Sequence, residues 1–137
     1  MSFEGFEFHH LGIAVADLDS GAASYKNLFG YNLVSGPFDD PIQKVSVSFL
    51  SRGEGDSALE LVAPFGADSP VDRLLRKGGG LYHVCYEVTD IRQAIAHLVS
   101  LDSLLLSGPV PAVAFEMREI AWLMTDTNLL VELVQAP

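Results

Sequence analysis

The chain has 137 residues, 49% of them hydrophobic, which is enough to form the core of one domain or of two small halves. Its 18 acidic and 8 basic residues give a formal net charge of −10, which argues against nucleic acids and anionic membranes as main partners. A single cysteine, Cys85, fits a reducing cytoplasm, and no long apolar run is present, so we expect neither a membrane span nor a signal peptide.

The first half of the chain predicts the order strand, helix and three strands. Phe6 to Val15 alternates as a strand does, and Asp17 or Asp19 is a suitable N-cap for the helix that follows. Gly30 is a suitable stop for that helix. Further strands are expected at residues 31–34, 45–49 and 58–62, with a loop at 36–41 and a turn at 52–57.

A linker over residues 65–80 separates two modules, which span about 6–64 and 81–136 of a single domain. Ser69 and Pro70 predict the start of a short helix in the linker, and three consecutive glycines at 78–80 end it. The second module repeats the order of the first. It has an expected strand at 81–88, a helix from Asp90, a strand at 104–106, a loop at 108–111 and strands at 120–124 and 129–134.

One motif occurs in both modules. His10 opens a run that reaches Asp17-Leu18, and His83 opens a similar run that reaches Asp90-Ile91. A Glu-Leu-Val follows each, with Glu60 50 residues after His10 and Glu132 49 residues after His83. The repetition predicts two β-α-β-β-β modules of the α+β class, which pair into one curved mixed sheet around a cleft.

The repeated His and Glu residues predict a metal site in that cleft. Glu60 and Glu132 lie among apolar neighbours, where a carboxylate is costly to bury unless it is paired, protonated or bound to a cation. Two imidazoles and two carboxylates suit one divalent ion such as Co, Ni, Mn, Fe or Zn. Each residue alone could be a hydrogen-bonded core His or a solvated Glu. The matched spacing of the two His and Glu residues favours the metal site over these alternatives.

The neighbours of the four residues have simpler interpretations. By strand alternation, His9 points to the face opposite His10, as a structural or exposed residue. Cys85 is interpreted as a small residue of the core or of the cleft wall. Glu87 lies on the His83 face, but its counterpart in the first module is Ala14, so the repeat does not support it as a ligand.

These motifs resemble the vicinal oxygen chelate superfamily, the paired β-α-β-β-β fold of glyoxalase I, extradiol dioxygenases and bleomycin-resistance proteins. The likeness covers about residues 6–136 and is greatest to methylmalonyl-CoA epimerase-like members. It rests on the runs 10–15, 60–64, 68–71, 80–83 and 87–91. It implies His10, Glu60, His83 and Glu132 as metal ligands and a homodimer that acts on a small molecule. It also implies Glu132 as the catalytic group.

The implied activity is that of an isomerase or lyase, in which a carboxylate removes a proton next to a metal-bound carbonyl. Two departures from the epimerase pattern bear on it. That pattern has a second catalytic Glu where this chain has Val47, which transfers no proton. The segment 109–117 is apolar, and Glu116 and Glu119 are the candidates there for a second base.

Two alternatives stay open. Glu60 is more like glyoxalase I (lactoylglutathione lyase), which has Glu at that position where some epimerases have Gln. A non-catalytic small-molecule-binding protein of the resistance type shares the fold but usually lacks the full set of four ligands. The fold alone does not decide between these functions.

Overall fold

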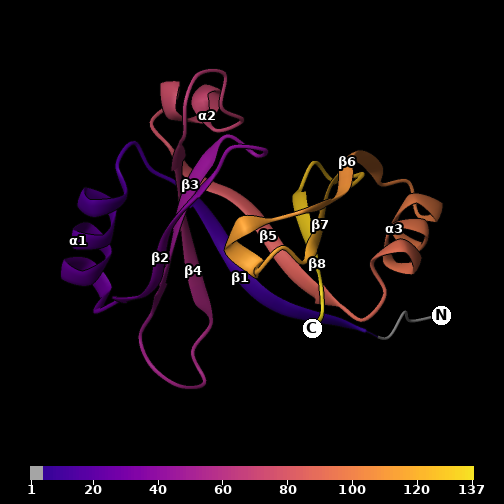
Figure 1. The fold of residues 1–137 in the computed structure, drawn as a ribbon, viewed down its shortest axis with the longest axis horizontal. Helices are drawn as coiled ribbons and strands as arrows, with labels where there is room; N and C mark the ends of the chain where they lie inside the picture. Colours follow the sequence, from indigo (N-terminus) through magenta and orange to yellow (C-terminus); the bar gives the residue numbers. More distant parts are fainter. Residues whose placement is uncertain (1–4) are drawn as a thin grey trace. The chain divides into compact units, whose positions relative to one another are not determined.

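A computed structural model describes residues 5–137, which form eight strands, three α-helices and one short 3-10 helix (Figure 1). Residues 1–4, part of the stretch in which we expect no signal peptide, lie outside the described residues. The described chain divides into an N-terminal unit, His10–Tyr82, and a C-terminal unit that joins residues 5–9 with His83–Pro137. None of the helices in residues 5–137 has the length and apolar character needed to cross a membrane.

The N-terminal unit is a four-stranded mixed sheet with strand order β2-β3-β4-β1. β4 runs parallel to β1, and the other two pairs are antiparallel. The elements are β1 Phe6–Ala14, of which residues 6–9 belong to the C-terminal unit, α1 Leu18–Phe29, β2 Asn32–Asp40, β3 Val45–Ser51, β4 Ala58–Pro64 and α2 Asp72–Arg76.

The helix α1 begins and ends where the sequence predicts. The Asp17 carboxylate accepts a hydrogen bond from the Ser20 N–H at 2.9 Å, and Gly30 ends the helix in the left-handed conformation. The helix packs against one face of the sheet (Figure 1), where Leu50, Leu61 and their neighbours form a core. Side chains alternate along a strand, so the residues between these core positions, Glu60 among them, point to the opposite face.

The C-terminal unit repeats this plan with strand order β5-β8-β7-β6, in which β8 runs parallel to β5. Asp90 caps α3 through the Gln93 N–H, and the Gln135 amide of the last strand accepts from the Ile91 N–H at 2.8 Å. The elements are β5 Gly80–Val88, α3 Ile91–Ser100, β6 Leu104–Pro111, the 3-10 helix Val113–Phe115, β7 Glu119–Met124 and β8 Leu130–Gln135.

The α+β class and the two β-α-β-β-β modules are therefore confirmed, but two predicted loops are wrong. Residues 36–41 and 108–111 lie largely within β2 and β6, which are longer than predicted. Both strands carry register shifts next to Gly36-Pro37 and Gly108-Pro109, the two cis peptide bonds in residues 5–137. A β-bulge keeps the strand going through residues that otherwise indicate a loop.

Gly36 and Gly108 occupy equivalent, crowded positions in the two units. A Cβ on Gly108 would lie 2.6 Å from the Ile120 carbonyl oxygen, and one on Gly36 would lie 2.8 Å from the Val47 carbonyl oxygen. Both glycines also have positive φ angles, +98° at Gly108 and +102° at Gly36. Only glycine meets both demands without moving the neighbouring strand.

We expect Gly108→Ala to lower the free energy of unfolding by more than about 2 kcal/mol, because backbone overlap adds to left-handed strain. Gly30→Ala is the matched control. Its φ is +81°, but a Cβ there meets no described atom within 4 Å, so strain alone costs about 1 kcal/mol. Urea unfolding of both variants measures the difference. Equal losses would contradict the role of the close approach.

Candidate metal centre

In the N-terminal unit, His10 and Glu60 form a buried pair. The His10 Nε2 lies 3.4 Å from the Glu60 Oε1, and the two residues are 0% and 4% exposed. Strand register explains the contact, because Gly12 of β1 lies directly opposite Glu60 of β4 in the parallel pair, and His10 is on the same face as Gly12. Without a side chain on Gly12, the imidazole can reach the carboxylate.

In the C-terminal unit, His83 and Glu132 form the equivalent pair. The His83 Nε2 lies 3.3 Å from the Glu132 Oε1, and both residues are 3% exposed. Cys85 of β5 lies opposite Glu132 of β8, which is the place that Gly12 has in the other unit. The repeat seen in the sequence is therefore a repeat of register, because a small residue stands opposite each Glu, two positions after each His.

The two pairs have the chemistry of divalent-metal ligands. Each unit offers one imidazole nitrogen and one carboxylate oxygen, the mixed donor set that suits first-row transition ions. Two atoms that each lie about 2.1 Å from one ion are about 3.0 Å apart at a right angle and about 3.4 Å apart at the tetrahedral angle. Within each pair, the nitrogen-to-oxygen distance, 3.4 Å in one and 3.3 Å in the other, fits two atoms that bind the same ion.

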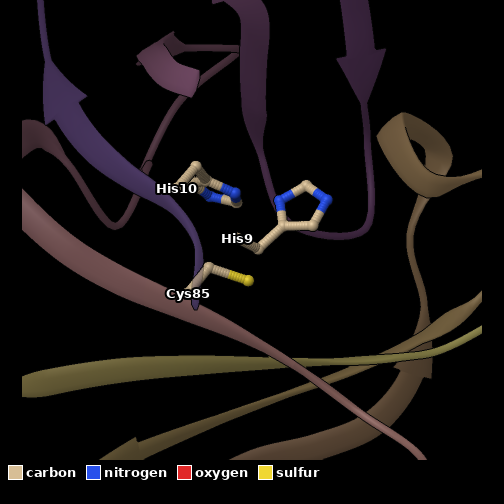
Figure 2. Close-up of side chains that lie close together, drawn as sticks. All are labelled: His9, His10 and Cys85. Atoms are coloured by element: carbon tan, nitrogen blue, oxygen red, sulfur yellow. The ribbon is translucent and has the colours of Figure 1, made fainter. Parts of the chain in front are cut away.

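His9 does not have the surroundings of an exposed residue. Its ring makes an edge contact with the buried Phe115, with 5.6 Å between ring centroids, and a ring nitrogen lies within 4.8 Å of the Cys85 sulfur (Figure 2). Cys85 is buried beside Glu132 on the same face of the C-terminal sheet. Of the two expectations for His9, structural or exposed, these contacts favour the structural one, and Phe115 comes from a distant segment of the chain.

The candidates for a second base fall elsewhere. The Glu119 carboxylate receives two hydrogen bonds from the Arg92 guanidinium of α3, at 2.9 and 3.2 Å, and these lower the pKa of Glu119 and raise the pKa of Arg92. Along β7, Glu119 has the parity of the α3 face, opposite to the face of Glu132. Glu116 is exposed. Val47 is buried on the Glu60 face of β3, opposite Val62.

Each His–Glu pair also has an aromatic neighbour that the sequence analysis did not single out. Phe49 of β3 lies opposite Glu60, and Trp122 of β7 lies opposite Glu132. Each ring makes an edge contact with the His of its own unit. A signal was present in the repeat, since Phe49 precedes Glu60 by 11 residues and Trp122 precedes Glu132 by 10.

Comparison with known proteins identifies the family of the chain. The profile of the Glyoxalase/Bleomycin resistance protein/Dioxygenase superfamily matches residues 9–122. The chain belongs to this superfamily. It is 36% identical to the ethylmalonyl-CoA/methylmalonyl-CoA epimerase of Cereibacter sphaeroides over 131 residues, which cover 93% of this chain and 96% of that protein.

Solved structures of two further epimerases are similar throughout their length. Methylmalonyl-CoA epimerase from Mycobacterium tuberculosis aligns with a TM-score of 0.83 and 26% identity over 100% of this chain and 94% of that one. A Streptomyces coelicolor methylmalonyl-CoA epimerase variant in complex with 2-nitronate-propionyl-CoA aligns with a TM-score of 0.80 and 25% identity, over 97% and 99% of the two chains. The prediction of an epimerase-like enzyme is thereby confirmed.

Proposed function

We propose that the protein is an epimerase of 2-alkylmalonyl-CoA thioesters that depends on one divalent metal ion. The observation that carries the proposal is the pair of buried His–Glu contacts at equivalent register positions. Relatives that are named epimerases of methylmalonyl-CoA and ethylmalonyl-CoA support the substrate class. His10, Glu60, His83 and Glu132 are the proposed ligands, and the ion is Co, Ni, Mn, Fe or Zn.

Glu132 is the proposed proton-transfer group. A carboxylate has two oxygens, so Glu132 can face the His83 Nε2 with its Oε1 and take the substrate proton with its Oε2. When bound, the ion would supply Lewis-acid stabilisation of the negative charge that moves onto the carbonyl oxygen as the proton leaves the adjacent carbon. Burial of Glu132 keeps water away from the carboxylate, which strengthens its interaction with the reacting atoms.

Inversion needs proton transfer on both faces of the planar intermediate, and Val47 cannot supply the second group. The residues of β3 with the parity of the Glu60 face are Val45, Val47, Phe49 and Ser51, none of which carries a carboxylate, an imidazole or an amine. We therefore propose that removal of the proton by Glu132 is efficient and that its return to the opposite face is the slower event.

Glyoxalase I activity is the second candidate. Glu60, where some epimerases have Gln, favours it, and so does the missing Glu at position 47. Both candidates share proton removal next to a carbonyl, so the substrate decides between them. A binding protein of the resistance type would bind a small molecule without turning it over.

We expect the purified protein to hold about one divalent ion per chain and His83→Ala to hold much less, because the variant removes a nitrogen ligand. Elemental mass spectrometry of both proteins, after reconstitution with Co, Ni, Mn and Zn in turn, measures this. His97→Ala, a substitution in α3, is the matched control and should keep the ion. A wild type without metal under all these conditions would remove the metal-dependent enzyme.

In deuterated water, we expect the metal-loaded protein to exchange the C2 proton of methylmalonyl-CoA faster than it inverts that carbon. Glu132→Gln should slow exchange by at least about 100-fold, the usual contribution of a general base. The exchange rate of Glu119→Gln should stay within about twofold of the wild-type rate, because Glu119 lies on the α3 face and its carboxylate contacts Arg92. Proton NMR follows the exchange.

The substrate controls separate the two enzyme candidates. The hemithioacetal of methylglyoxal and glutathione is offered to the same protein preparation. Turnover of this compound with no exchange of methylmalonyl-CoA would favour glyoxalase I. Binding of either compound without turnover would favour the resistance-type protein.

The proposal includes a homodimer in the cytoplasm. The single cysteine suits a reducing compartment. Strand β6, at the edge of the C-terminal sheet, exposes three leucines, Leu104, Leu105 and Leu106, and apolar sheet edges are usually covered. We expect sedimentation equilibrium to give twice the chain mass and Leu104→Lys to reduce it towards the monomer. A monomeric wild type at micromolar concentration would contradict the dimer.

A further inference from the structure

The two histidines of the candidate metal centre each face the edge or plane of one aromatic ring. The His83 and Trp122 rings have centroids 4.7 Å apart and planes at 86°, and the His10 and Phe49 rings have centroids 5.6 Å apart and planes at 78°. Both are near-perpendicular arrangements, the favoured geometry for aromatic pairs. Each contact lies within one unit of the structure.

The geometry points to Phe49 and Trp122 as positioning residues that hold the imidazole planes of His10 and His83. The contact with Glu60 or Glu132 fixes where one ring nitrogen lies. A contact at one nitrogen does not by itself define the plane of an imidazole, because the χ2 angle of histidine has broad energy minima. A perpendicular aromatic ring on the neighbouring strand fixes this plane, since turning the imidazole would bring the two rings into collision.

Strand register makes these contacts a consequence of the fold. Phe49 stands directly opposite Glu60 and Trp122 directly opposite Glu132, in antiparallel pairs where opposite side chains touch. The same three-residue set of His, Glu and aromatic ring therefore occurs once in each unit. Its recurrence at equivalent register positions argues for a role at the histidines, because core packing alone does not require a ring there.

The two sets differ in the size of the aromatic ring and in its distance from the histidine. Trp122 is the larger ring and lies closer to its histidine, at 4.7 Å against 5.6 Å. We expect His83 to depend on Trp122 more than His10 depends on Phe49. The ligand that is held most rigidly is then His83, next to the proposed proton-transfer group Glu132.

The test uses the full chain with Co²⁺ as the probe, and it rests in part on the proposed metal site. Trp122→Leu keeps an apolar side chain but removes the ring, and Trp122→Phe restores a ring. Ile120→Ala is the matched control. Ile120 is buried on the same face of β7, two residues from Trp122, and its substitution also removes core volume. Phe49→Leu is the counterpart in the other unit.

Two readings are taken for each variant. Ring mobility of His83 is measured by carbon-13 relaxation at its Cε1 in the metal-free protein, and Co²⁺ affinity is measured by the visible absorption of the bound ion. Trp122→Leu should mobilise the His83 ring and weaken Co²⁺ binding about tenfold, in the range for loss of a residue that orients a ligand. Trp122→Phe and Ile120→Ala should stay within about threefold, with an ordered ring. Phe49→Leu should weaken Co²⁺ binding by an intermediate factor and leave the His83 ring ordered, because Phe49 contacts His10.

The outcomes separate this inference from the proposed function. A wild type that binds no Co²⁺ would end the proposed metal site, while His83 ring mobility would still decide the positioning role. An ordered His83 ring in Trp122→Leu, with affinity equal to that of the wild type, would overturn the inference. Equal losses in Trp122→Leu and Ile120→Ala would also overturn it, because they would trace the effect to stability.

Discussion

The rest of the structure depends on the burial of two carboxylates, each against one imidazole. Glu60 and Glu132 are at most 4% exposed in strands whose neighbouring side chains form the core. A carboxylate in such a place must interact with a cation or a hydrogen-bond donor. That requirement fixes which residue stands opposite it, how large that residue is, and on which strand the histidine lies.

The rest of each unit meets these demands. A helix covers the face of the sheet that carries the buried aliphatic side chains, which leaves the other face for the His–Glu pair. A parallel strand pair brings the histidine strand beside the glutamate strand, with Gly12 or Cys85 opposite the carboxylate. An antiparallel strand on the other side of the glutamate supplies an aromatic ring, Phe49 or Trp122. Each feature is local to one unit and occurs twice.

The sequence predicted those parts of the fold whose signals are local. Asp17, Gly30 and Asp90 marked the helix ends, since capping depends on residues within one turn. The four candidate ligands were found because the chain repeats, which let two weak signals support each other. The extent of β2 and β6 was not predicted, because Gly36-Pro37 and Gly108-Pro109 read as loop residues unless the neighbouring strand is known. Phe49 and Trp122 read as ordinary core residues for the same reason: register decides what they touch.

The doubled arrangement has a stereochemical consequence. The two His–Glu pairs are equivalent by register, so exchanging one for the other leaves the donor set unchanged. A substrate with a chiral carbon has no such symmetry, and two equivalent pairs of donors cannot by themselves tell its two ends apart. Under the proposed function, the choice of orientation therefore falls to the positions where the repeat has diverged, Gly12 against Cys85 and Phe49 against Trp122. Divergence between the two copies, at residues outside the four proposed ligands, would then set which end of the substrate meets Glu132.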